Sequence, residues 1–243
     1  MTDRSELLAD LAARIRQIER ARIRSTRDDA ESPTTISGLG RLLPDVLSMR
    51  GGLIEWLSDR NGAGSTSLAI LASLPVVTNE LWVFVDGERH WNAAGFTPLS
   101  LNLQRTVFVK PDRPADVLWA AEQALRTRGV GAVVCEVDRL SPASFRRLQL
   151  AAETGGSLGI LLRPERVRHQ PSWAECRLLV RPLAMAGPPK TSQPRRRLLV
   201  EALRTRRGFQ SESVIVELDD ANGRVCVASE LAVATTAARA AGA

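Results

Sequence analysis

The chain of 243 residues is 44% hydrophobic and 25% charged, a balance that is typical of a folded globular protein and excludes an intrinsically disordered chain. No apolar run approaches the roughly 18–20 residues of a membrane-spanning helix, so we expect no membrane partner. The net charge is +6, and all but two of the 33 basic residues are arginine. This excess of arginine fits either phosphate binding or a coding bias.

The compartment is indicated by the cysteines and the first residues. Three scattered cysteines and two histidines predict neither a disulfide framework nor a metal site. The charged first residues lack the apolar core of a secretory signal. We therefore expect a cytoplasmic, nucleoid-associated protein with reduced thiols and without a bound metal.

Residues 1–25 are predicted to contain an interaction helix that runs from about residue 5 to residue 24. Its apolar side chains have the 3-4-3 spacing of a short coiled-coil seam. They are Leu8, Leu11, Ile15 and Ile18. The polar residues 26–37 are typical of a linker. Because a helix ahead of a linker cannot bury its stripe locally, the stripe either packs on its own domain or binds a partner protein or a second subunit.

Residues 38–185 show short apolar runs that alternate with helical patterns. The predicted strands are 52–57, 81–85, 105–109, 132–137, 158–162 and 177–181. The predicted helices are 65–73, 115–128 and 141–153. Strands that alternate with helices at this spacing predict βαβ units, and the unbroken apolar runs are typical of strands covered on both faces. The predicted fold class is α/β, with a mostly parallel sheet flanked by helices.

The C-terminal part is predicted to extend this sheet with antiparallel strands. Residues 186–197 form a basic, Pro-rich connector, and residues 198–228 contain strands at 198–204, 212–218 and 224–228. Asn222-Gly223 is a hairpin signal before the last strand. The Ala-rich tail, 229–243, is either a weak helix or unstructured.

The most informative segment is a strand, a Gly-containing loop and a helix between Gly52 and Ala69. Backbone amides at such a helix N-terminus can hold a phosphate. The pattern G-x-x-x-x-G-K-[ST] is met only in part, because Ser65 stands in place of the Lys and Asp59 in place of the first Gly. That Lys ordinarily brings positive charge to the β- and γ-phosphates. We therefore interpret the loop as the remnant of a nucleotide-binding site. Its residues are Gly62, Gly64, Ser65, Thr66 and Ser67.

Three segments resemble the RecA family in their order and spacing. Residues 47–56 resemble the strand that enters the RecA phosphate loop, and residues 82–90 resemble the strand that ends at the catalytic glutamate. Residues 132–136 resemble the Walker B strand. The resemblance implies a RecA-like fold. It also implies that Glu88 is the remnant of the catalytic glutamate and that Glu136 replaces the Walker B aspartate.

The RecA resemblance covers about residues 38–183, and both DNA-binding loops of RecA are shortened in it. Residues 138–142 lead almost directly from the Walker B strand into a helix, and residues 163–172 replace the second loop without any Gly. With the loop Lys absent as well, we expect no ATPase activity, no cofactor and no RecA-type filament on DNA. The sequence leaves residual binding of ATP and Mg²⁺ open.

Within this superfamily the chain is most similar to ImuA, the RecA-like accessory proteins of bacterial mutagenesis cassettes. The similarity lies in the short length, the degenerate phosphate loop, the Arg163-Pro164 strand end and the segment 206–208 before the final hairpin. It implies a role in the SOS response, in error-prone translesion synthesis after DNA damage. The implied partners are an ImuB-like homologue of the Y-family polymerases, an error-prone replicative-type polymerase complex and RecA.

Basic residues concentrate over 188–210, which holds seven of them and one acid. Clustered arginine is a footprint of phosphate binding, but the segment offers only Phe209 for base stacking. Whether it faces DNA or a partner protein stays open. The candidate basic patch, which includes arginines near the shortened second loop, consists of Arg163, Arg166, Arg168, Arg195, Arg196, Arg197, Arg204, Arg206 and Arg207.

Together these patterns predict a non-catalytic RecA-like adaptor that binds partner proteins and, weakly, DNA; self-association stays open. One alternative is a divergent DNA-dependent ATPase of the recombinase-mediator type, with Glu88 as water-positioning base and Arg60 in place of the Lys. Another is a simple DNA-binding module. Most tryptophans are expected in the core, with Trp91 and Trp173 as interface candidates. His90 and His169 are expected to be ordinary surface residues, a role that leaves them no part in catalysis.

Overall fold

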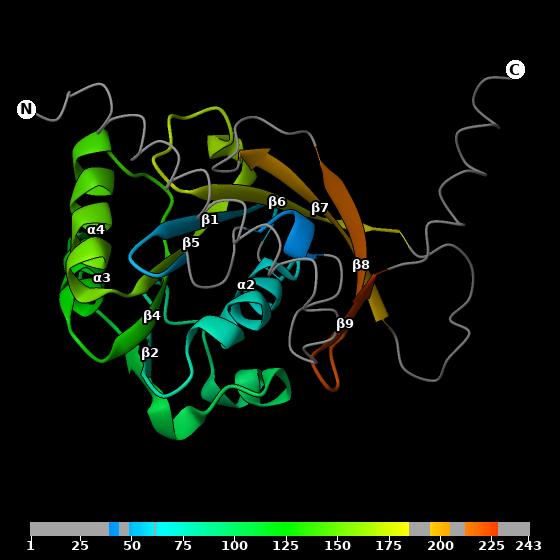
Figure 1. Ribbon diagram of the computed structural model, residues 1–243, viewed down its shortest axis with the longest axis horizontal. Coiled ribbons are helices and arrows are strands. Elements are labelled where there is room, and N and C mark those ends of the chain that lie inside the picture. The colour runs from blue at the N-terminus through cyan, green and yellow to red at the C-terminus, as the bar shows by residue number, and fades with distance from the viewer. Residues whose placement is uncertain (1–38, 44–48, 61, 185–194, 205–211, 228–243) are drawn as a thin grey trace, which may run out of the picture. The chain divides into compact units, whose positions relative to one another are not determined.

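A single nine-stranded sheet organises the part of the chain that the structure describes, which is residues 39–43, 49–60, 62–184, 195–204 and 212–227 of a computed structural model (Figure 1). The strand order is β3-β2-β4-β5-β1-β6-β7-β8-β9. The pairs from β3 through to β6 are parallel, and the pairs from β6 to β9 are antiparallel. The α/β class, the mostly parallel sheet and its antiparallel extension are thus confirmed.

The parallel strands are short and, toward the middle of the sheet, almost wholly apolar. They are β1 (Leu53–Ser58), β2 (Leu81–Val85), β3 (Thr106–Val109), β4 (Val130–Glu136), β5 (Leu158–Pro164) and β6 (Cys176–Leu183). Strands β1, β4 and β5 are buried along nearly their whole length because both faces of the sheet are covered. Their carboxyl ends therefore define one edge at which loops gather.

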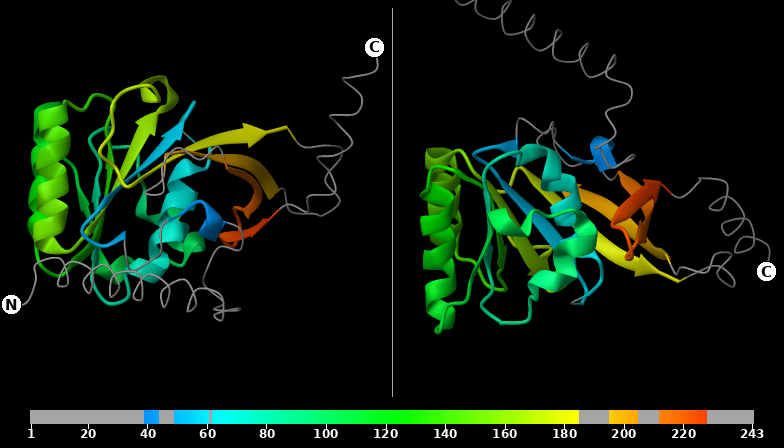
Figure 2. Two further views of the ribbon diagram at one scale, coloured as in Figure 1. Left: turned by 45° about the horizontal axis from the view of Figure 1, so that its top comes forward. Right: turned by 90° about the horizontal axis from the view of Figure 1, so that it is seen from below.

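The helices cover opposite faces of this parallel half. They are α2 (Ser65–Ser73), α3 (Pro114–Arg126) and α4 (Pro142–Gly155). Short 3-10 segments complete the layers at Leu39–Arg41, Leu74–Val76, Ala93–Leu99, Leu103–Arg105 and Glu165–Val167. Figures 1 and 2 show α3 and α4 on one face and α2 on the other. Two apolar clusters result, one under α2 and one under α3 and α4.

Local sequence signals explain the start and the end of α4. Ser141 caps its N-terminus by accepting a hydrogen bond from the amide of Ser144 at 3.1 Å, and Pro142 follows at the first helical position. Gly156 ends the helix in a left-handed conformation with φ of 69°. No helix within the described ranges is long and apolar enough to cross a membrane.

The antiparallel half shares the core under α2. Its strands are β7 (Arg195–Arg204), β8 (Ser213–Asp219) and β9 (Arg224–Val227). Leu198 and Val200 of β7 are buried in the core. Burial alternates along the strand, so the neighbouring side chains point to the other face of the sheet. The expected connector over 186–197 is therefore too long at its end, because Arg195, Arg196 and Arg197 belong to β7. The wrong boundary arose from treating three consecutive arginines as a linker rather than as strand residues.

Several predictions lie outside the described residues. These are the interaction helix with Leu8, Leu11, Ile15 and Ile18, the linker at 26–37, the arginines Arg206 and Arg207, and the tail at 229–243. The three cysteines are free, as expected. Burial raises the pKa of the Cys135 and Cys176 thiols to about 12, so both stay protonated and unreactive at neutral pH.

Candidate functional site

The loop that the sequence analysis interprets as the remnant of a phosphate loop lies between β1 and α2. Gly64 precedes the helix with φ of 97°, a left-handed conformation that glycine adopts without strain. Ser65 is the first helical residue, where the pattern requires Lys, and its hydroxyl lies 3.3 Å from the hydroxyl of Ser58. The geometry of a strand, turn and helix N-terminus is thus retained, but no cationic side chain comes from the first turn of the helix.

Strand β7 covers this loop from the side. A Cβ atom placed on Gly64 would lie 2.7 Å from Cδ1 of Leu198 and 3.7 Å from Nη1 of Arg196. The Arg196 guanidinium donates to the carbonyl of Gly62 at 2.8 Å and also pairs with Asp220. Ala63, Gly64 and Ser65 are all buried. The loop backbone is therefore packed against the protein at the position where a phosphate loop exposes its amides.

The carboxylates at the carboxyl ends of β2 and β4 have different surroundings. Asp86 is buried and accepts hydrogen bonds from the amides of His90 and Trp91 at 3.1 and 3.0 Å, so it fixes the turn after β2. Glu136 lies 3.2 Å from Nε2 of His90. Glu88 is exposed on the same turn. The turn thus carries an acidic residue at the surface while its neighbours hold its shape.

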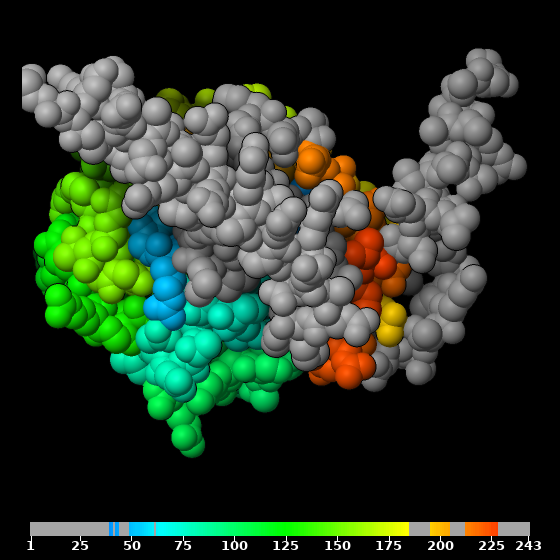
Figure 3. Space-filling model, in the orientation of Figure 1, coloured from blue at the N-terminus to red at the C-terminus, as the bar shows by residue number. Residues whose placement is uncertain are grey.

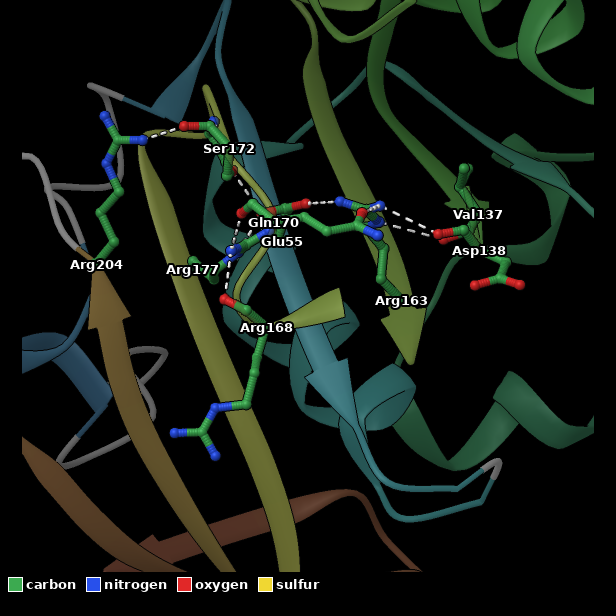
Figure 4. Close-up of polar contacts among 10 residues, drawn as sticks. Glu55, Val137, Asp138, Arg163, Arg168, Gln170, Ser172, Arg177 and Arg204 are labelled. Carbon is green, nitrogen blue, oxygen red and sulfur yellow. Dashed lines mark hydrogen bonds and ion pairs between the residues drawn. The ribbon is translucent and has the colours of Figure 1, made fainter. Parts of the chain in front are cut away.

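A buried ionic cluster lies on the face of the sheet covered by α3 and α4 (Figure 4). At its centre is Glu55 of β1, whose side chain is 0% exposed. One carboxylate oxygen accepts from Nη1 of Arg163 at 2.6 Å. The other accepts from Nε of Arg177 and from the Ser172 hydroxyl, each at 2.5 Å. Three strands, β1, β5 and β6, and the segment after β5 therefore meet at one carboxylate.

The ionisation of Glu55 is set by two opposed effects. Burial alone would raise the pKa of its carboxyl group, because desolvation disfavours the charged form. The hydrogen bond and charge of Arg177, with the hydrogen bonds from Ser172 and Arg163, outweigh that effect and hold the pKa below its ordinary value of 4.5. Glu55 is thus ionised at neutral pH and balances part of the charge of the two buried guanidinium groups.

The cluster fixes the segment 165–175, which we call the β5–β6 segment. Arg177 donates from Nη1 to the carbonyls of Arg168 and Gln170, each at 2.8 Å, and Arg204 of β7 donates to the carbonyl of Ser172. Val167 packs in a small apolar cluster on the same face of the sheet. The backbone of this segment is therefore tied to three strands at several points, in contrast to a free loop.

Arg163 contradicts the prediction of a surface basic patch. Its side chain is buried, and besides Glu55 it binds the carbonyls of Val137 and Asp138 and the side-chain oxygen of Gln170. The prediction is wrong because the Arg-Pro strand end was treated as a loop, whereas β5 continues to Pro164 and buries the arginine. Because it is buried, the Arg163 side chain cannot contact DNA or a partner protein.

The other described arginines of that patch are at least partly exposed, but most are paired. Arg166 pairs with Asp138 and Arg168 with Glu165. The arginines of β7 pair with carboxylates of β8 and of the turn after it: Arg195 with Glu217 and Asp219, Arg196 with Asp220, and Arg197 with Glu217. Most of the arginines of the predicted patch that the structure describes therefore take part in separate local ion pairs.

The tryptophans divide into core and surface residues. Trp56, Trp82 and Trp91 are buried, so the prediction of Trp91 at an interface is wrong: its ring packs edge-on against Phe84. Trp173 is 47% exposed, so its role at an interface stays a prediction, and Trp119 is 61% exposed. Glu55, the centre of the buried ionic cluster, was not among the predicted residues, although a single charge inside the apolar strand LIEWLS is a signal of a buried ion pair.

Known structures identify the fold of this protein. No family model matches the sequence. The structure is similar to the crystal structure of the RadB recombinase, with a TM-score of 0.54, 13% sequence identity, and coverage of 74% of this chain and 92% of that chain. At this identity the likeness shows the fold alone, and the fold is RecA-like.

Part of the sequence is also similar to a particular kind of RecA-like protein. Over 110 residues the chain is 32% identical to the protein ImuA from two strains of Caulobacter vibrioides, a match that covers 45% of this chain. The chain spans 38% of the length of these curated relatives. The chain thus has a RecA-like fold and is similar over part of its length to ImuA.

Proposed function

We propose that this protein is a non-catalytic RecA-like adaptor in damage-induced, error-prone translesion synthesis in the cytoplasm. It would connect an ImuB-like homologue of the Y-family polymerases to an error-prone replicative-type polymerase complex, with RecA as a further partner. The relationship to ImuA supports this context. The RecA-like fold also supports the proposal.

One observation carries the non-catalytic part of the proposal: strand β7 packs against the phosphate-loop remnant. A bound phosphate needs the loop amides to face it and a nearby positive charge. Here Leu198 lies against Gly64, and Ser65 supplies no charge. Arg196 lies beside the loop, and its guanidinium is already shared between the Gly62 carbonyl and Asp220. Nucleotide binding would require β7 to move.

The test of this part is ATP turnover by the full-length chain, with and without single-stranded DNA. We expect no turnover above background and no difference between the wild type and Glu88→Gln. Turnover that requires both DNA and Glu88 would overturn the proposal and favour the divergent ATPase. Because Arg196 lies beside the loop, Arg196→Ala would then show whether this arginine replaces the missing Lys.

The adaptor part is tested by direct binding of the full-length chain to the purified ImuB-like protein. We propose that two segments outside the described residues contact this partner. They are the apolar stripe with Leu8, Leu11, Ile15 and Ile18 and the basic residues around Arg206 and Arg207. The double variant Leu11→Asp with Ile15→Asp should lose binding while the RecA-like domain stays folded by circular dichroism. Binding that persists in this variant would refute the role of the helix.

A further inference from the structure

Trp173 is a large aromatic side chain held at the surface by buried neighbours. It is 47% exposed, whereas Ser172 and Ala174 on either side of it are buried. The Arg146 guanidinium of α4 lies over its ring, 5.7 Å from the centroid. Leu150, one helical turn further along α4, is 43% exposed and lies on the same side of the helix as Arg146. An exposed indole therefore lies under a guanidinium group of α4, on a side of that helix that also exposes an apolar side chain.

The position of Trp173 is fixed by the buried ionic cluster. The hydroxyl of Ser172 donates to Glu55 and accepts from the amide of Ala174 at 3.1 Å, and the amide of Glu175 donates to the carbonyl of Leu53 at 2.9 Å. The backbone on both sides of the indole is thus anchored to the sheet. Because this backbone is already ordered, binding through the indole costs less entropy than binding through a mobile loop, and the aromatic group is well suited to anchor a partner.

The charges around Trp173 indicate what kind of partner fits. No carboxylate within the described ranges forms an ion pair with Arg146. The next residue, Arg147, shares the carboxylate of Glu122 with Arg126, so two guanidinium groups have one acid between them. Further along α4, the carboxylate of Glu153 accepts a hydrogen bond from the side chain of Gln149 at 3.0 Å. Of these groups on α3 and α4, the three guanidinium groups outnumber the two carboxylates, and side chains of α4 lie at the surface in Figure 3.

We propose that Trp173, Arg146 and Leu150 form a docking surface for an acidic protein segment that carries a large apolar side chain. The apolar side chain packs on the indole and Leu150, and a carboxylate of the segment pairs with Arg146. A protein segment fits better than nucleic acid, because one face of the only aromatic ring in the patch is already occupied by Arg146. The proposal rests on the adaptor function, since it names one surface through which the adaptor would bind its partner.

The experiment measures the affinity of the full-length chain for the purified ImuB-like protein by isothermal titration calorimetry. Trp173→Ala and Arg146→Glu should each weaken binding at least about tenfold, the loss expected for an interface anchor. Trp119→Ala is the matched control, because it removes an equally large exposed indole that lies beside Val109 and Pro111 instead. Its affinity should equal that of the wild type. Thermal unfolding of each variant verifies that the domain is intact.

Hydrogen exchange of the ImuB-like protein then locates the segment that it contributes. The segment protected by the wild type, and not by Trp173→Ala, should contain Asp or Glu next to a large apolar residue. A protected segment that is basic or lacks a large apolar residue would overturn the proposal.

The possible failures differ from one another. If the wild type binds and both variants bind equally well, the docking surface is wrong while the adaptor function stands. If the wild type does not bind the ImuB-like protein at all, the adaptor function fails and the surface fails with it. If Trp173→Ala instead abolishes binding of a fluorescein-labelled oligothymidine, the surface recognises nucleic acid and the proposal is overturned.

Discussion

Two segments that follow neighbouring strands of the sheet are held in place by different forces. The loop after β1 is closed by packing, because Leu198 of β7 lies against Gly64 and both are buried. The β5–β6 segment, residues 165–175, is held by charge: Arg163 and Arg177 both pair with buried Glu55, Arg177 donates to two backbone carbonyls of the segment, and Arg163 donates to the side chain of Gln170. In a RecA-like fold both positions belong to the edge at which ligand-binding loops gather.

The two segments show that a fold can hold a loop in place in two ways, which respond differently to pH and to substitution. Apolar packing does not depend on pH, and it responds mainly to changes in volume. A buried ion pair adds little net stability in place of apolar residues, but the removal of one partner leaves an uncompensated charge. The charged segment should therefore be the more sensitive of the two to a single substitution.

The largest expected effect is that of Glu55→Ala. It leaves Arg163 and Arg177 buried without their carboxylate, which should lower the free energy of unfolding by about 3–5 kcal/mol. Urea denaturation followed by far-UV circular dichroism measures this change. A loss no larger than that of an exposed ion pair would show that the cluster does not hold the β5–β6 segment.

Substitution of the two loop glycines tests whether packing against Leu198 holds the loop after β1. Both Gly62 and Gly64 have positive φ, so an Ala at either position should lower stability by about 1–2 kcal/mol through backbone strain. Only Gly64→Ala also clashes with Leu198, since a Cβ on Gly62 has no neighbour within 4 Å. Gly64→Ala should therefore be clearly worse than Gly62→Ala in urea denaturation.

A double-mutant cycle isolates the clash at Gly64. In a Leu198→Ala background, the additional loss caused by Gly64→Ala over Gly62→Ala should largely disappear, because the clashing methyl groups are absent. An unchanged difference would mean that Leu198 does not close the loop.

The pH dependence of stability should distinguish the two segments further. The pKa of Glu55 is lowered in the folded protein, so its stabilising contribution is present above about pH 4.5 and is lost as the pH falls through the lower folded value. The stability difference between the wild type and Glu55→Gln should thus shrink below pH 4.5. The difference between Leu198→Ala and the wild type should stay constant over the same range, since neither side chain titrates.

The smallest effect is expected for Arg166→Ala, within the same β5–β6 segment. Its ion pair with Asp138 is largely exposed on both sides, so solvent screens it and its removal should leave stability almost unchanged. Urea denaturation beside Glu55→Ala makes this the matched control. A large loss would mean that surface pairs, rather than the buried cluster, hold the segment.

The parallel half of the fold could be predicted from local patterns. Helix α2 and strand β2 have the predicted boundaries, because an apolar run bounded by turn residues is visible within a few positions. The buried cluster could not be predicted in this way. Glu55 finds Arg163 and Arg177 on strands that are distant in sequence, and no local pattern links them. The same holds for Leu198, whose contact with Gly64 depends on β7 folding back across the sheet.

The central place of β1 has a consequence for the chain while it is being synthesised. Its two neighbours, β5 and β6, begin only at Leu158 and Cys176, so the ribosome releases β1 long before it can pair. A short apolar strand without partners is a site for aggregation, and a charge within it acts against that. Glu55 is the one charge in β1. The residue that joins the finished sheet is thus also the one charge that interrupts this apolar strand before its partners are synthesised.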